Sequence, residues 1–135
     1  MIRIAITFTI LGLLFGNFVS AADFNISPVM GQFGLKQESS VNIKIDTADD
    51  SINAAQAKIK FNPGVLEVKS ISKDGSIFNF WLQEPEFSNT EGMIEFIGGT
   101  TSGVSGASLQ VLKINFIAKG IGLSEFSFTD GAVCF

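Results

Sequence analysis

Apolar and polar residues alternate with a period of two along most of the chain after residue 22. Such alternation is typical of a strand that buries one face on a core and leaves the other in water, as in an antiparallel sheet. No window of useful length after residue 22 has the spacing of an amphipathic helix. The apolar positions that we expect to point inward are Val41, Ile43, Ile45, Ala55, Ala57, Ile59, Phe61, Ile94, Phe96, Leu112, Ile114, Phe116, Ala118, Phe126 and Phe128.

Turn-forming residues separate these apolar runs. Asn62-Pro63-Gly64 is the strongest such signal, because proline presets φ and glycine accepts a positive φ. The spacing predicts an all-β domain, an antiparallel jelly-roll β-sandwich of about nine strands. The other expected turns lie at Asp74-Gly75, Glu91-Gly92, Gly120 with Gly122, and Asp130-Gly131.

Two polar segments are predicted to be loops without a ligand. The stretch 98–106 is rich in glycine, serine and threonine, but it lacks the lysine and the following helix of a phosphate-binding loop. The stretch 47–51 carries Asp49 and Asp50 close to Asp46, and these carboxylates could attract calcium. An EF-hand loop requires oxygens at alternating positions, a central glycine and a distal glutamate, and that pattern is missing. We therefore expect no metal site.

The first residues resemble a secretory signal peptide rather than part of the domain. Arg3 gives a positive start, an apolar run follows at 4–15, and small residues lie at 19–21. A retained membrane anchor is the alternative, although the apolar run falls short of the roughly 20 residues of a spanning helix. We predict a signal peptide at residues 1–21, cleavage after Ala21 or Ala22, one domain at 22–135, and a secreted or cell-surface location.

The charge balance excludes some classes of partner. Without Arg3, the predicted mature chain has 8 Lys against 13 Asp plus Glu, so its net charge is −5. Nucleic-acid binding needs clustered Lys and Arg to displace phosphate counterions. No basic face is available for an anionic membrane surface either. We therefore expect no nucleic-acid partner and no membrane insertion after signal cleavage.

The residue types present leave little scope for catalysis. The chain has no histidine and one cysteine, which excludes Ser-His-Asp and Cys-His arrangements, zinc sites with histidine, and thiolate metal sites. The paired carboxylates are Glu84 with Glu86 and Glu91 with Glu95, but nothing in the pattern places either pair across a cleft. We expect no catalytic residues, no cofactor and no enzymatic activity.

Two single residues have open interpretations. Trp81 is the one tryptophan among 14 phenylalanines, and either it lies partly in the core or it is an exposed anchor for a partner or a sugar ring. Cys134 cannot form a disulfide within the chain. It is either a small buried side chain in the last strand or the source of an intermolecular disulfide.

The order of several short segments resembles the cohesin domains that hold dockerin-bearing proteins on bacterial surfaces. The resemblance covers about residues 23–135 and depends on the ordered set rather than on one motif. The segments that carry it are Ile52-Asn53-Ala54-Ala55, Phe61-Asn62-Pro63-Gly64-Val65-Leu66-Glu67-Val68, Gly75-Ser76-Ile77-Phe78, Trp81, Glu84-Pro85, Ser88-Asn89, Gly92-Met93-Ile94-Glu95-Phe96, Gly98-Gly99, Gly103 with Gly106, and 112–119.

The resemblance implies a jelly-roll sandwich, shared with cellulose-binding modules, that binds a dockerin-type partner in polysaccharide-degrading or cell-surface assemblies. Dockerins are small helical modules that bring their own calcium, and in the family they dock on one flat sheet face. By position, the partner-binding residues would be Gln56, Lys58, Lys60, Met93, Glu95 and Ile97, with Trp81 as a further candidate. A mixed face of charges with a few apolar anchors suits a reversible protein interface.

Other functions remain open at this point. The same residues could form a plain wetted sheet face. The chain could be a carbohydrate-binding module that recognises polysaccharide directly, although such a face usually presents several exposed aromatic residues. A structural or adhesive surface subunit, or binding to another exported protein, is a third alternative, since the fold alone does not decide the function.

Overall fold

The computed structural model describes residues 18–19, 23–27, 36–120 and 126–134, and within them it contains strands but no helix. None of the described part is therefore a helix long and apolar enough to cross a membrane. The described strands are β1 (Phe18–Val19), β2 (Asp23–Ser27), β3 (Glu38–Asp46), β4 (Ile52–Lys60), β5 (Leu66–Ser72), β6 (Phe80–Ser88), β7 (Met93–Val104), β8 (Leu109–Ala118) and β9 (Ser127–Cys134).

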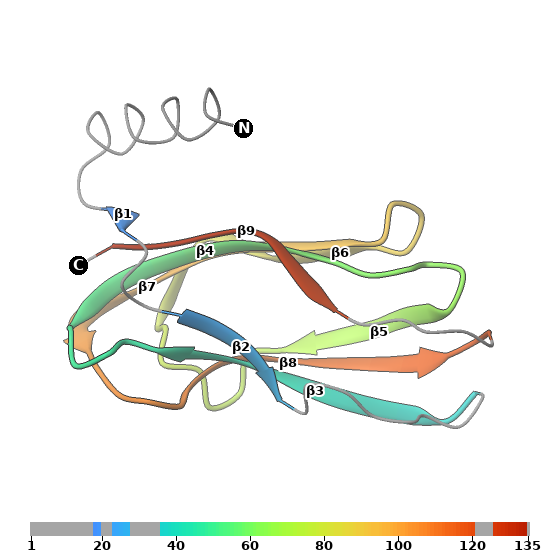
Figure 1. Ribbon diagram of the computed structural model, residues 1–135, viewed down its shortest axis with the longest axis horizontal. Helices are drawn as coiled ribbons and strands as arrows, with labels where there is room; N and C mark the ends of the chain where they lie inside the picture. The colour runs from blue at the N-terminus through green and yellow to red at the C-terminus, as the bar shows by residue number, and fades with distance from the viewer. Residues whose placement is uncertain (1–17, 20–22, 28–35, 121–125, 135) are drawn as a thin grey trace.

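The strands form two antiparallel sheets that face each other (Figure 1). One sheet has the order β1-β9-β4-β7-β6 and the other has the order β2-β3-β8-β5. Some neighbouring strands are consecutive in the chain, such as β6 beside β7, and others come from distant parts of it, such as β9 beside β4 and β3 beside β8. The prediction of an all-β antiparallel jelly-roll sandwich is confirmed.

The core lies between the sheets and includes all the predicted inward residues, together with others such as Ile52, Leu66, Val68, Phe78, Val111 and Val133. Of these, Phe128 alone is half-buried, and it packs against the same cluster. Phenylalanine rings join the two sheets, with ring centroids 5.5 Å apart for Phe61 and Phe126 and 5.2 Å apart for Phe116 and Phe126. Full burial of a phenylalanine contributes about 2–3 kcal/mol of transfer free energy, so these rings are a large part of the stability.

Two of the expected turns have a glycine with positive φ, whereas Gly64 in the Asn62-Pro63-Gly64 turn does not. Gly75 and Gly92 have φ angles of 74° and 71°, in a region that residues other than glycine rarely adopt. Gly92 also lies against the end of β4, where its carbonyl accepts a hydrogen bond of 2.9 Å from the N–H of Phe61. A Cβ at Gly92 would overlap the Phe61 carbonyl oxygen, so glycine is required here for space as well as for φ.

Two loop or turn predictions are wrong. Residues 98–104 continue β7, because Gly98 and Gly99 pair with β4 on one side and with β6 on the other. Asp130 and Gly131 lie inside β9, next to a register shift rather than a turn. At Gly131 a Cβ would lie 3.2 Å from the ring of Phe24, so glycine makes room for that ring.

The predicted signal peptide lies mostly outside the described residues. Its described part is β1, in which Phe18 pairs with Cys134 and Val19 with Val133 at the end of β9. Cleavage after Ala21 would remove these two pairings and leave β9 as the edge of its sheet. The side chain of Cys134 is not among the described side chains, so the two interpretations of this residue stand as before.

Candidate protein-binding face

Four neighbouring strands, β9, β4, β7 and β6, present one continuous outward surface. We call this surface the docking face and define it by its register rows. In the order β9, β4, β7, β6, the first three rows are Ser127–Lys60–Met93–Ser88, Asp130–Lys58–Glu95–Glu86 and Ala132–Gln56–Ile97–Gln83. The fourth row is Ala54–Gly99–Phe80, from β4, β7 and β6.

The structure brings six of the seven candidate residues together on this face. Alternation along β4 and β7 buries Ala57, Ile59, Ile94 and Phe96 and turns their neighbours outward. Gln56 then lies opposite Ile97, Lys58 opposite Glu95, and Lys60 opposite Met93. The register therefore places these residues side by side as three cross-strand pairs, about 5 Å between Cβ atoms in such pairs.

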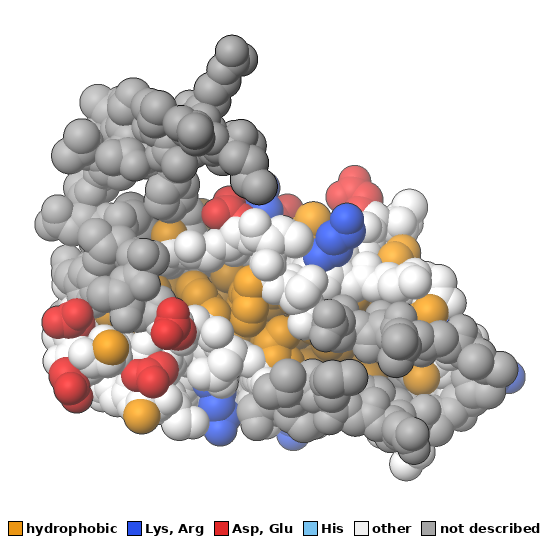
Figure 2. All heavy atoms as spheres, viewed as in Figure 1, with side chains coloured by type: hydrophobic (Ala, Val, Ile, Leu, Met, Phe, Trp, Pro, Cys, Tyr) orange, Lys and Arg blue, Asp and Glu red, His pale blue; other side chains and the backbone are white. Residues whose placement is uncertain are grey.

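The second row concentrates charge. Lys58 is flanked by Asp130 on β9 and by Glu95 on β7, while Glu95 has Glu86 opposite it on β6. The ion pairs found in the described residues are Lys69 with Glu67 and Lys73 with Glu84, and neither involves a residue of this row. Figure 2 shows basic and acidic side chains close together along this outer surface. The charges of the row are thus available to a partner.

Apolar side chains lie toward the other end of the face. Phe80 is 41 % exposed and Leu82 is 74 % exposed, both on β6. A Cβ at Gly99 would lie 2.6 Å from Cε2 of Phe80, so the Phe80 ring lies directly over this glycine. With the half-buried Ile97, this end offers the apolar anchors that protein interfaces usually combine with a charged surround.

Trp81 lies on the inner side of the same sheet. Its ring makes edge-to-face contacts with Phe78 and Phe96 at centroid distances of 5.7 Å and 6.1 Å. A Cβ at Gly98 would come within 2.8 Å of Cζ3 of Trp81, and the Nζ of Lys73 lies 5.9 Å from the ring centroid. Trp81 therefore packs at the edge of the core, apart from the six outward residues.

The sequence pattern missed the contributions of β6 and β9 to the face. Gln83 and Glu86 come from β6, where two register shifts and Pro85 interrupt the alternation. Asp130 was assigned to a turn, although it pairs with Lys58. No periodic signal identifies such positions, because a bulge changes which side of the strand a residue faces.

A depression of ≈ 90 Å³ lies within the face. Its lining comes from all four strands, which makes it a property of the assembled sheet and not of one hairpin. The lining residues are Gln56, Ala57, Lys58, Gln83, Glu95, Phe96, Ile97 and Asp130. This size suits one partner side chain rather than a small-molecule ligand, because ligand pockets usually measure about 300–1,000 Å³.

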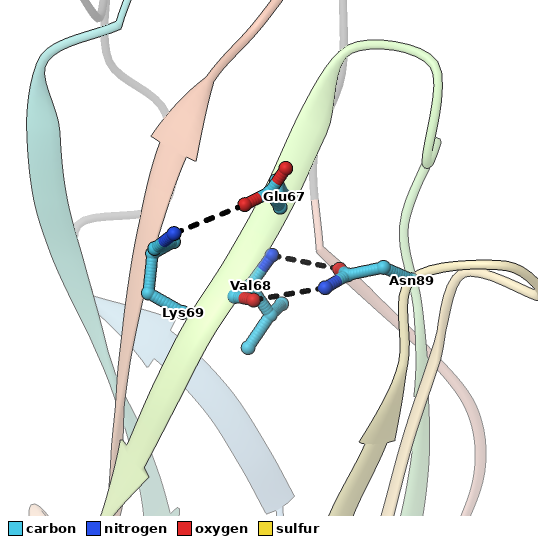
Figure 3. A network of polar contacts seen from close by, with 4 residues as sticks. All are labelled: Glu67, Val68, Lys69 and Asn89. Atoms are coloured by element: carbon cyan, nitrogen blue, oxygen red, sulfur yellow. Dashed lines mark hydrogen bonds and ion pairs between the residues drawn. The ribbon is translucent and has the colours of Figure 1, made fainter.

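Asn89 ties the β6–β7 turn to the opposite sheet (Figure 3). The N–H of Val68 donates a hydrogen bond of 2.8 Å to Oδ1 of Asn89. In return, Nδ2 of Asn89 donates a bond of 2.9 Å to the carbonyl of Val68. The Asn89 amide thus completes the free edge of β5 and fixes the end of the β6–β7 hairpin that carries the face.

The carboxylate pairs do not form a catalytic arrangement. At the irregular part of β6, Glu84 pairs with Lys73 at 2.6 Å, whereas Glu86 lies opposite Glu95 on the face. Acidic side chains also gather at the end that carries the β3–β4 turn (Figure 2). In the described part of the chain, no three acidic or cysteine residues are arranged to hold a metal ion. The Oδ1 of Asp46 accepts a bond of 2.9 Å from the N–H of Ala48 within this turn.

Comparison with protein families identifies the domain. The family model of the cohesin domain matches residues 34–133, which is most of the chain. The chain belongs to the cohesin family. Cohesin domains are non-catalytic binding modules. A comparison with curated protein sequences finds no match.

Solved cohesin structures share the fold of this cohesin at low sequence identity. The cohesin module of a family 33 glycoside hydrolase from Clostridium perfringens has a TM-score of 0.67 and 12% identity, covering 85% of this chain and 84% of its own. The sixth cohesin of scaffoldin B from Acetivibrio cellulolyticus, in complex with a Cel5 dockerin mutant, has a TM-score of 0.64 and 14% identity, with coverages of 84% and 86%. The second type II cohesin of the adaptor scaffoldin ScaA from Acetivibrio cellulolyticus has a TM-score of 0.61 and 13% identity, with coverages of 83% and 73%.

Proposed function

We propose that this cohesin is an exported, non-catalytic module that binds a dockerin-type partner through the docking face. The observation that carries the proposal is the register of β9, β4, β7 and β6, which gathers exposed charges and apolar anchors on one flat surface. Solved relatives such as the scaffoldin B cohesin are complexes with dockerins, which supports the choice of partner. Calcium would belong to the dockerin and not to this chain.

The second element of the proposal is that this domain has no catalytic activity of its own. The sequence has no histidine, and the described carboxylates lie in ion pairs, in turns, on the docking face or on strands of the other sheet. No arrangement among them has two carboxylates facing across a cleft, as a glycosidase requires. We expect the purified domain to show no turnover of polysaccharide or ester substrates.

Export of the protein is a further part of the proposal. The charged start, apolar run and small residues before Ala21 and Ala22 support cleavage of a signal peptide there. N-terminal sequencing of the protein from the culture medium or the cell surface should begin at residue 22 or 23. A soluble product inside the cell that retains Met1 would contradict export.

Binding to isolated dockerins tests the proposed partner. Each dockerin module encoded by the source organism would be produced singly, loaded with calcium, and titrated against the purified domain by calorimetry. We expect saturable one-to-one binding to at least one of them. Binding to polysaccharide with none to any dockerin would instead support a carbohydrate-binding module.

A further inference from the structure

Glu86 and Glu95 lie directly opposite each other on neighbouring strands of the docking face. Like charges in this arrangement destabilise a sheet, whereas a pair of opposite charges or a neutral pair would stabilise it. On β4, Lys58 lies beside Glu95 but already has Asp130 on its other side. The second row therefore holds three carboxylates and one ammonium group, and its excess negative charge lies toward β6.

Among the described residues, neither glutamate takes part in an ion pair, and the nearest further lysine by register is Lys60, diagonally across from Glu95. Lys69 and Lys73 form the described ion pairs with Glu67 and Glu84, and none of these four residues belongs to the row. Glu86 is exposed and Glu95 is half-buried, so both carboxylates are accessible from the outer side of the sheet. A positive charge supplied from outside would stabilise the pair, because it would replace a repulsion with two attractions.

The apolar end of the face sets a second requirement on the same partner. Phe80 lies over Gly99, four residues along β7 from Glu95. Four residues of a strand span about 13 Å. A partner that covers both features must present its positive charge and its apolar side chain about that far apart.

We propose that the partner of the docking face carries a lysine or arginine that binds between Glu86 and Glu95, together with an apolar side chain, about 13 Å away, that packs on Phe80 and Ile97. This inference rests on the proposed function and adds the chemistry of the partner surface to it. Glu95 borders the depression, whose lining also includes Gln83, Ile97 and Lys58 but not Glu86, so it is the aliphatic part of such a side chain that would lie there.

The double variant Glu86→Gln with Glu95→Gln tests the positive charge. Glutamine keeps the size of the side chain and removes the charge, so the fold should be retained. Against a calcium-loaded dockerin that binds the parent domain, we expect the variant to bind about tenfold or more weakly at low salt, with a smaller loss at high salt. The free variant should also melt about 1–3 °C higher, because the cross-strand repulsion is gone.

The matched control is Glu38→Gln with Glu67→Gln. These two residues flank Ile117 on the outer face of the other sheet, and their replacement changes the net charge by the same amount. The control should bind within about twofold of the parent domain, since its charges lie far from the docking face.

The outcomes separate the inference from the proposed function. If a dockerin binds the parent and the Glu86 and Glu95 variant equally well, the partner places no positive charge between these glutamates. The inference is then wrong, and the proposed function stands. If the variant and its control weaken binding equally, the loss comes from the change in net charge. The inferred contact of the partner's positive charge with Glu86 and Glu95 is then also wrong. If no dockerin binds the parent domain, the proposed function fails and this inference fails with it.

Discussion

Asn89 supplies the free edge of β5 with the two hydrogen bonds that a neighbouring strand would provide. β5 is the last strand of its sheet, so the N–H and carbonyl of Val68 have no strand on that side. A buried backbone group without a partner costs about 1–3 kcal/mol, which makes a two-bonded asparagine valuable at this position. The contact also links the two sheets, because Asn89 belongs to the β6–β7 turn.

Replacing Asn89 with alanine should lower the free energy of unfolding by about 1–3 kcal/mol, because both Val68 groups lose their partner. Urea denaturation measures this loss. Asn115→Ala is the control, since the Asn115 side chain donates one described bond, to Oγ of Ser70, on an exposed surface. Equal stability of the two variants would show that the Asn89 bonds contribute no more than an exposed side-chain contact.

Gly98 and Gly99 are adjacent, but they make room for aromatic rings on opposite sides of the sheet. Ala at Gly98 would press on Phe78 and Trp81 in the core and should cost about 1–3 kcal/mol of stability. Ala at Gly99 would press on Phe80, which is partly exposed and can turn away, so stability should change by less than about 0.5 kcal/mol. Thermal melts compare the two, and a larger loss for Gly99→Ala would contradict the assignment of the two sides.

At the scale of elements, alternation predicted β4 and the first part of β7 well, because their residues face either a core or water at every step. The same pattern gave no information where glycine carries no side chain to alternate, which is why 98–104 was expected to be a loop. It also failed in β6, where bulges around Gln83 and Pro85 change the facing of successive residues. The sequence therefore predicted the two central strands of the docking face and missed its edges.

Position in the sheet should set the local stability of each strand. β4 and β7 are hydrogen-bonded on both sides, whereas β6 has a neighbour on one side and carries two irregularities. Backbone amides in β4 and β7 should therefore exchange with deuterium most slowly in this sheet, and those in β6 faster. Exchange in β6 as slow as in β7 would indicate that another element protects its free edge.

At the scale of the whole molecule, the two outer surfaces of the sandwich differ in kind. The docking face combines unpaired charges with Phe80 and Ile97. On the outer face of the other sheet, Gln110 donates to Asn42 and Asn115 donates to Ser70, and the exposed large apolar side chains of the described residues all lie elsewhere, on β6. This contrast supports one face as the binding surface and makes the other face a suitable control.

The central claim is that the docking face binds the partner, and one comparison of binding kinetics tests it most directly. The variant carries Lys58→Glu, Lys60→Glu and Ile97→Ala. The control carries Lys44→Glu, Lys113→Glu and Ile117→Ala, which are the same changes on the outer face of the other sheet. Thermal melts establish that both fold.

Against a dockerin that binds the parent domain, the docking-face variant should bind at least about tenfold more weakly, because the loss of the Ile97 contact should speed dissociation. The lysine reversals should change the association rate and its salt dependence. The control should bind like the parent. A docking-face variant that melts normally and binds as tightly as the parent would contradict the account.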